Sequence, residues 1–312
     1  MYLATLRSKQ SVAVAALLAL AINSMASAAP RVDDQTWPLY VNVEQDGKLI
    51  TGLTASNFRV FLDDRGQDFE LQPPDTPASL VLLMEYSRQS GMFLEEMRNA
   101  IDGFLEHAPE GNWYALVTFD RTSNIVVDFT KEKGQIRAAL YNLPEPMWNE
   151  INSYDAISNI IERMARVSGR RAIVFLGSGF DTFSAASLDA IEKSMGATDV
   201  SIYCLGTGSA LRTTYAPYLD ISSEMDLLQA RAFLTMLSEK SGGDAWFPDF
   251  ETVFHDAMEG VMQDLATQYK LVVKGAIPSD GRLHKIKVEA FTITNEKRKN
   301  FKVRVREGVR RD

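Results

Sequence analysis

The chain has 312 residues, of which 46% are hydrophobic and 24% are charged, an ordinary composition for a globular protein. Its formal net charge of −8 at pH 7 argues against general nucleic-acid binding, because displacing the counterions of phosphate groups requires a basic face. The one cysteine, Cys204, excludes an internal disulfide. It lies in an apolar run, where we expect a buried small side chain.

The first 28 residues have the features of a signal peptide. Arg7 and Lys9 form a basic start, residues 12–22 are apolar, and small residues lead up to Ala28. The apolar stretch is shorter than the roughly 20 residues that a membrane-spanning helix needs. We therefore expect cleavage between Ala28 and Ala29, giving an exported protein, periplasmic or secreted, with no transmembrane segment after cleavage.

Residues 29–77 predict a β segment. Hydrophobic and polar residues alternate along much of it, and Asp-Gly at 46–47 and Arg-Gly at 65–66 indicate turns. The sequence "PPDTP" at 73–77 ends this part, because prolines cannot continue strand pairing and make a stiff connection.

Residues 78–267 alternate between apolar strands and amphipathic helices. The run 79–85 reads as a fully apolar strand, and a strand at 124–129 follows its neighbour after a short turn, as an antiparallel edge strand would. This alternation predicts a mostly parallel sheet with helices on both faces, the doubly wound α/β class. The other expected strands are 113–120, 171–177 and 200–206, and the expected helices lie around 93–105, 136–143, 157–164, 188–195, 225–240 and 253–265. The helix at 225–240 carries the apolar residues Leu227, Leu228, Phe233, Leu234 and Leu237.

Ligands of such sheets bind where the strands end, at their carboxyl edge. Four connections follow strand ends or lie close to them in the predicted fold: 85–91, 148–154, 177–184 and 205–224. We expect the last of these to be a long irregular loop, and loops of that length are usually functional or mobile.

Residues 268–312 return to the alternating pattern of strands. Lys302, Arg304 and Arg306 face one way along the last strand, where we expect a solvated face. We predict that this C-terminal β segment packs with residues 29–77 as one smaller β-rich domain, with the α/β unit inserted between them.

The order of these elements, which begins with "VLLMEYSRQSG" at 81–91, resembles a von Willebrand factor A (VWA) domain. More narrowly, the chain is similar to the VWA-related proteins that some bacteria export. The run "GLTASNFRVFLDD" at 52–64 matches their N-terminal signature, and "TQYKLVVKGAIPSDGRLHKIKV" at 267–288 echoes their C-terminal one. The resemblance covers nearly the whole mature chain, and it implies a VWA fold for residues 78–267.

The resemblance also implies the position of a metal-ion-dependent adhesion site. In the family, Asp-x-Ser-x-Ser after the first strand, a Thr from a second loop and an Asp after the fourth strand hold Mg²⁺ or Mn²⁺ through oxygen atoms. At the matching positions this chain has Glu85, Ser87, Gln89, Ser153 and Ser178. One anionic position is lost, and at the other the carboxylate is displaced by a methylene. We therefore predict a degenerate site without a metal.

Aromatic residues are frequent in the loops at the same edge, which suits a protein-binding surface. An alternative is that several of them pack down on the sheet. The candidate contact residues are Trp148, Tyr154, Phe180, Asp181, Phe183, Tyr215 and Tyr218.

Serine-hydrolase chemistry is not indicated. Ser178 lacks a Gly-x-Ser-x-Gly context, and His107, His255 and His284 are scattered along the chain. We interpret the protein as a non-enzymatic VWA-type module that binds another protein, of unknown identity, without a metal. Two alternatives stay open: Mg²⁺- or Mn²⁺-dependent adhesion through an atypical oxygen set that includes Asp181, and a structural or assembly role in the cell envelope.

Overall fold

The computed structural model describes residues 36–250, 253–294 and 296–311. The predicted signal peptide and its cleavage point between Ala28 and Ala29 lie outside these residues. Among the helices that are described, none combines the length and the hydrophobicity needed to cross a membrane.

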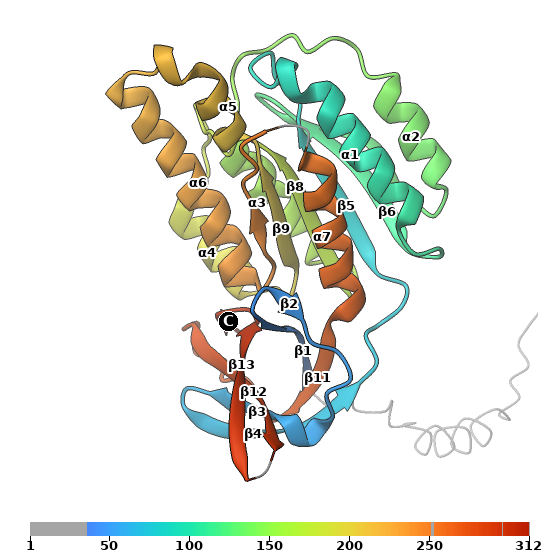
Figure 1. Ribbon diagram of the computed structural model, residues 1–312, viewed down its shortest axis with the longest axis vertical. Coiled ribbons are helices and arrows are strands. Elements are labelled where there is room, and N and C mark those ends of the chain that lie inside the picture. The colour runs from blue at the N-terminus through green and yellow to red at the C-terminus, as the bar shows by residue number, and fades with distance from the viewer. Residues whose placement is uncertain (1–35, 251–252, 295, 312) are drawn as a thin grey trace, which may run out of the picture. The chain divides into compact units, whose positions relative to one another are not determined.

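A six-stranded sheet forms the centre of the α/β part, in the order β10–β9–β8–β5–β6–β7 (Figure 1). All neighbours are parallel except β6 and β7, so β7 is the antiparallel edge strand that the sequence predicts. The strands are β5 (Ser79–Glu85), β6 (Trp113–Phe119), β7 (Ser123–Thr130), β8 (Arg171–Gly177), β9 (Ser201–Gly206) and β10 (Ala245–Trp246).

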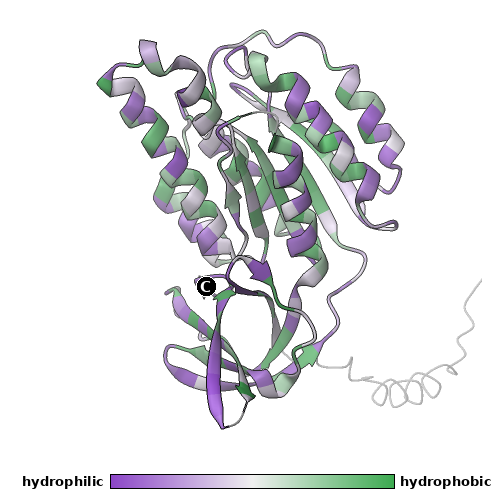
Figure 2. Ribbon diagram, viewed as in Figure 1, coloured by the Kyte–Doolittle hydropathy of each residue, from purple (hydrophilic) through white to green (hydrophobic). Residues whose placement is uncertain are grey.

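Helices cover both faces of this sheet, which explains why its inner strands are apolar throughout (Figure 2). On β5, Leu80 and Leu82 pack on one face, whereas Val81 and Leu83 pack on the other. The prediction of a doubly wound α/β fold is therefore confirmed. The first face carries α1 (Leu94–His107), α2 (Lys133–Tyr141) and α7 (Phe254–Thr267), and the second carries α3 (Ser153–Met164), α4 (Leu188–Gly196) and α6 (Ile221–Ser241).

Strands from the two ends of the described chain pair in a second, antiparallel sheet, the β-rich part. Six of them form a closed ring of pairings, β1–β11–β4–β3–β12–β13 and back to β1, and β2 and β14 are added at its margins. Whether this part is a domain in its own right stays a prediction. The strands are β1 (Thr36–Gln45), β2 (Lys48–Leu49), β3 (Phe58–Leu62), β4 (Arg65–Gln72), β11 (Tyr269–Lys274), β12 (His284–Thr294), β13 (Lys297–Arg304) and β14 (Gly308–Val309).

One predicted turn is shifted. The hairpin between β3 and β4 turns at Asp63 and Asp64, not at Arg65 and Gly66, which already belong to β4. Both aspartates have positive φ, 47° and 63°, as a two-residue hairpin turn requires. Aspartate tolerates this conformation better than most residues, but the neighbouring glycine gave the stronger signal in the sequence.

The prediction of an irregular loop over 205–224 was wrong. Residues Gly208–Tyr215 form helix α5, Ala216–Tyr218 form a short 3-10 helix (η3), and α6 already begins at Ile221. Ala210 is fully buried in the core, so tertiary packing stabilises a helix that its Gly-Ser and Thr-Thr pairs disfavour locally.

Buried charges join the β-rich part to α7, and here too a prediction was wrong. Arg304 on β13 is not solvated: its Nη2 and Nη1 lie 2.7 and 2.5 Å from the carboxylate of Asp264, a buried residue on α7. Burial disfavours the charge of Arg304, but its hydrogen bonds to Asp264 outweigh this and raise its pKa. Arg306 is also buried and donates to the carbonyl of Gly196, whereas Lys302 is exposed as expected.

Replacing Arg304 by methionine should destabilise the protein by about 3–5 kcal/mol, because the buried carboxylate of Asp264 loses its partner. Lys302→Met, on the same strand, is the matched control and should cost about 0–1 kcal/mol, as exposed ion pairs do. Urea unfolding measures both; equal losses would contradict the assigned importance of the Arg304–Asp264 pair.

His284 links two loops of the β-rich part. Its Nδ1 lies 2.7 Å from Asp63 and its Nε2 lies 3.0 Å from Asp280. The hydrogen bond to Asp63, followed by that to Asp280, raises the pKa of His284 above 6.5. The protonated imidazole donates to both carboxylates at once.

We expect the stabilisation by His284 to be complete below its unfolded pKa of 6.5 and to fade as the pH rises through its higher folded pKa. The difference in unfolding free energy between wild type and His284→Gln should therefore be largest below pH 6.5 and shrink as the pH rises above it. His255→Gln, at a half-exposed histidine on α7, is the control. A difference that stays constant as the pH rises would contradict the expectation.

Candidate functional site at the carboxyl ends of the strands

The loops that follow β5 and β8 meet the 148–154 segment at one edge of the sheet and are joined to it by backbone hydrogen bonds. The N–H of Arg88 donates to Trp148 over 2.8 Å, and that of Thr182 donates to Ile151 over 2.8 Å. The N–H of Thr207, in the fourth connection, donates to Gly177 over 3.0 Å. All four connections that the sequence assigns to this edge therefore lie together there.

Glu85, the last residue of β5, points its carboxylate across to the end of β8. Its Oε2 accepts from the backbone N–H of Ser178 at 2.7 Å and from the Ser178 hydroxyl at 2.6 Å. Its Oε1 accepts from the hydroxyl of Ser87 at 3.0 Å. Glu85, Ser87 and Ser178 are all buried, so the degenerate positions are brought together, but they bind one another.

The direction of these bonds follows from their neighbours. The Ser87 hydroxyl accepts from the backbone N–H of Ser90 at 3.1 Å, and the Ser178 hydroxyl accepts from that of Phe180 at 3.2 Å. Each hydroxyl proton is therefore free to be donated to Glu85. Burial raises the pKa of Glu85, and the donors from Ser178 and Ser87 oppose that rise. Three convergent donors are the arrangement that an ionised carboxylate needs.

Sequence reasoning missed two residues of this arrangement. Ser90 exchanges hydrogen bonds with Ser87, and the Ser-x-x-Ser spacing before a helix was the available signal. Gly177 gives Glu85 its space: a Cβ at this position would lie 2.7 Å from the Glu85 Cβ and 2.8 Å from Oε2. A side chain at 177 would therefore displace the carboxylate.

The remaining degenerate positions do not complete a set of metal ligands. Ser153 is fully buried and its hydroxyl has no hydrogen-bond partner among the described residues, whereas Gln89 is exposed beside a pocket. The carboxylate of Glu85 is already occupied by three donors. In the described parts of the chain, no three His, Cys, Asp or Glu side chains cluster as metal ligands would. These residues do not fit a divalent ion.

Asp181 accepts hydrogen bonds from the start of α3 and from its own loop. Its Oδ1 accepts from the N–H of Tyr154 at 3.0 Å, in the first turn of α3, and from the hydroxyl of Ser184 at 2.6 Å. A carboxylate at a helix N-terminus satisfies free N–H groups and interacts favourably with the helix dipole. Asp181 therefore binds the start of α3 and Ser184, and it takes no part in the hydrogen bonds of Glu85.

A pocket of about 420 Å³ opens between the 179–182 loop and the α5–α6 region. Its apolar lining includes the partly buried Tyr154 and Phe180, which pack onto the core beneath the sheet edge. Gln89 also lines it, next to the degenerate site. The pocket combines apolar walls with a few polar groups, as binding sites do.

The other candidate aromatic residues are exposed to different extents. Phe183 is 79% exposed and Tyr218 is 84% exposed, and Tyr215 is also exposed on the wall of the pocket. Trp148 is half covered, because Arg121 lies over its ring at 4.0 Å. The candidate residues therefore divide into supporting side chains, Tyr154 and Phe180, and a solvent-facing group.

Comparison with known proteins supports one family. Residues 81–180 match the model of the von Willebrand factor type A domain. No curated protein matches the chain. Three similar solved structures have TM-scores below 0.5. The fold is therefore assigned from the match of residues 81–180 to the family model and from the topology of the six-stranded sheet.

The first is an aerotolerance-related membrane protein from Bacteroides fragilis (TM-score 0.47, 13% identity, 61% of this chain and 98% of that chain). The second is a von Willebrand factor type A protein from Catenulispora acidiphila (0.46, 8%, 89% and 75%). The third is proximal thread matrix protein 1 from the mussel byssus with a zinc-occupied MIDAS motif (0.45, 15%, 62% and 46%), so this chain spans less than half of that one. The match over 81–180, the parallel sheet and the helices on both of its faces show that the α/β part of this chain is a von Willebrand factor type A domain.

Proposed function

We propose that this protein is an exported, non-enzymatic module that binds another protein through the carboxyl edge of its VWA domain, without a metal ion. The observation that carries the proposal is the partly apolar pocket that Gln89 lines, with the exposed Tyr215 on its wall. The exposed Phe183 directly follows Thr182, another residue of the lining. Aromatic side chains at such an edge give large apolar contact area at low entropic cost.

The internal bonding of Glu85 supports metal independence. A metal ion would have to displace the donors of Ser87 and Ser178 from a buried carboxylate, and it would gain only neutral hydroxyl ligands in return. A small divalent cation loses strong hydration on binding, so one carboxylate offsets this cost poorly. The alternative, adhesion through Mg²⁺ or Mn²⁺, finds its best support in the unpartnered Ser153 hydroxyl.

The contacts of the histidines support a role without catalysis. His284 is held by Asp63 and Asp280, His255 lies 3.4 Å from Glu259, and His107 contacts the carbonyl of Gly103. Ser178 donates its hydroxyl proton to Glu85 and accepts from a backbone N–H. The Ser178 hydroxyl is also buried, and its burial together with these bonds supports a structural role.

The second alternative is an assembly role in the cell envelope through the β-rich part. Its ring of pairings leaves few free strand edges, so such contacts would have to use exposed side chains such as Ile293, which is 67% exposed. This residue provides a control surface for the partner experiment below.

Metal independence predicts that Mg²⁺, Mn²⁺ or EDTA leaves the melting temperature of the wild-type protein unchanged. An ion present at a hundred times its Kd would add about 2.7 kcal/mol of stability, which thermal unfolding detects easily. Glu85→Gln should lower stability by about 1–3 kcal/mol in either buffer, because the amide brings a donor toward groups that are already donors. A stabilisation by Mn²⁺ that Glu85→Gln abolishes would favour the metal-dependent alternative.

Partner binding should depend on the edge aromatics and not on divalent ions. In crosslinking pull-downs from native cells, Phe183→Ser/Tyr215→Ser should recover at least about tenfold less partner than wild type, since each buried aromatic contributes about 1 kcal/mol or more. EDTA should have no effect, and Ile293→Ser, on the β-rich part, should bind normally. Loss of the partner with Ile293→Ser alone would instead favour the assembly role.

A further inference from the structure

Helix α6 carries two apolar stripes on opposite faces. Phe233, Leu234 and Leu237 are buried against the core of the VWA domain, and Leu227 is also buried. A helix that covers one face of a sheet is usually polar on its other side. On α6, however, the outward face carries Ile221, Met225, Leu228 and Ala232, and the first three are 86%, 51% and 56% exposed.

The spacing of the outer stripe is that of a helix–helix contact. Successive members are four, three and four residues apart, which places all four along one narrow line of a helix with 3.6 residues per turn. The core of the domain does not use this line, because it faces away from the buried stripe.

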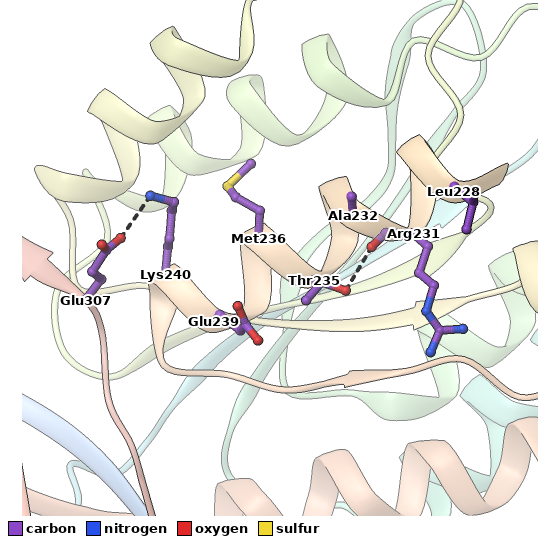
Figure 3. Close-up of a pocket in the computed structure, with 8 residues that line it drawn as sticks. All are labelled: Leu228, Arg231, Ala232, Thr235, Met236, Glu239, Lys240 and Glu307. Carbon is purple, nitrogen blue, oxygen red and sulfur yellow. Dashed lines mark hydrogen bonds and ion pairs between the residues drawn. The ribbon is translucent and has the colours of Figure 1, made fainter. Parts of the chain in front are cut away.

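A hollow of about 600 Å³ follows the outer face of α6 (Figure 3). Its wall includes Leu228, Arg231, Ala232 and Thr235, which are residues i, i+3, i+4 and i+7 of one helix. Four residues in this relation form the hole that receives one side chain in knobs-into-holes packing. The small Ala232 lies at its centre, so an inserted side chain can approach the backbone closely.

The stripe is complementary to itself when it is reversed. Ile221 and Ala232 lie at equal distances on either side of its midpoint, as do Met225 and Leu228. In an antiparallel pair of α6 helices, Ile221 of one copy therefore enters the hole around Ala232 of the other, and the reverse contact follows by symmetry. A two-fold interface requires this reciprocity.

The charges beside the stripe fit the same arrangement. Glu224 and Arg231 lie two turns apart on one flank of the stripe, and in an antiparallel pair this flank faces its own equivalent. Glu224 of each copy then faces Arg231 of the other. Within the chain, Glu224 approaches Arg212 at 3.8 Å, and Arg231 donates to the Ser209 hydroxyl at 3.1 Å and rests over the ring of Phe247. Both side chains remain exposed.

We propose that α6 is the contact of a homodimer, in which the outer stripes of two copies pack antiparallel about a two-fold axis that passes between Met225 and Leu228. The interface uses Ile221, Met225, Leu228 and Ala232. It is independent of the proposed partner-binding edge, because none of these four residues lines the 420 Å³ pocket.

Sedimentation velocity of the purified chain over a concentration series tests the proposal. Wild type should be a dimer at micromolar concentrations, and Leu228→Glu should weaken self-association at least tenfold because it places two carboxylates in the apolar contact. Ile293→Glu, at an equally exposed apolar position, should dimerise as wild type does. A wild type that stays monomeric, or a Leu228→Glu variant that dimerises normally, would overturn the proposal.

A charge exchange tests the antiparallel geometry. Glu224→Arg and Arg231→Glu should each self-associate at least tenfold more weakly than wild type, because like charges then meet across the axis. An equimolar mixture of the two variants should dimerise, since at each of these contacts one variant supplies the charge that is opposite to that of the other. A mixture that associates no better than its components would exclude this pairing, and circular dichroism confirms that both variants are folded.

Discussion

The buried carboxylate of Glu85 holds the carboxyl edge of the VWA domain together. It joins the end of β5 to the end of β8 through Ser178, and its other oxygen binds Ser87 in the following turn. The position that the resemblance aligns with a metal ligand satisfies backbone and hydroxyl donors within this chain. The loops are fixed by hydrogen bonds within the protein, so the edge is already organised before any partner arrives.

Much of the fold could be predicted from the sequence, because the strands of a sheet covered on both faces must be apolar throughout and their helices must be amphipathic. The prediction failed where tertiary contacts outweigh local preference. Helix α5 forms over a Gly-Ser start because Ala210 is buried, and Arg304 leaves solvent because Asp264 lies opposite it. Asp264 lies far from Arg304 in the sequence, and most residues of the core cluster that includes Ala210 lie far from Ala210. A local sequence pattern therefore reveals neither contact.

The candidate site was predicted in position but not in bonding. The resemblance to the VWA motif implied that Glu85, Ser87 and Ser178 lie at one edge. It could not show that the longer glutamate reaches the end of β8, or that Gly177 leaves room for it. Asp181 illustrates the same limit: its carboxylate serves the first turn of α3. Which neighbour a side chain selects depends on a few ångströms of backbone placement.

The closed ring of strand pairings in the β-rich part constrains the order in which the protein folds. Strand β1 pairs with β13 through Asn42 and Arg304, so the ring joins the first described strand to one that lies far along the chain. It cannot close until β13 has been synthesised, well after β1. The intervening α/β unit, whose contacts are more local, can be ordered first and bring the two ends near each other, which lowers the entropic cost of that final closure.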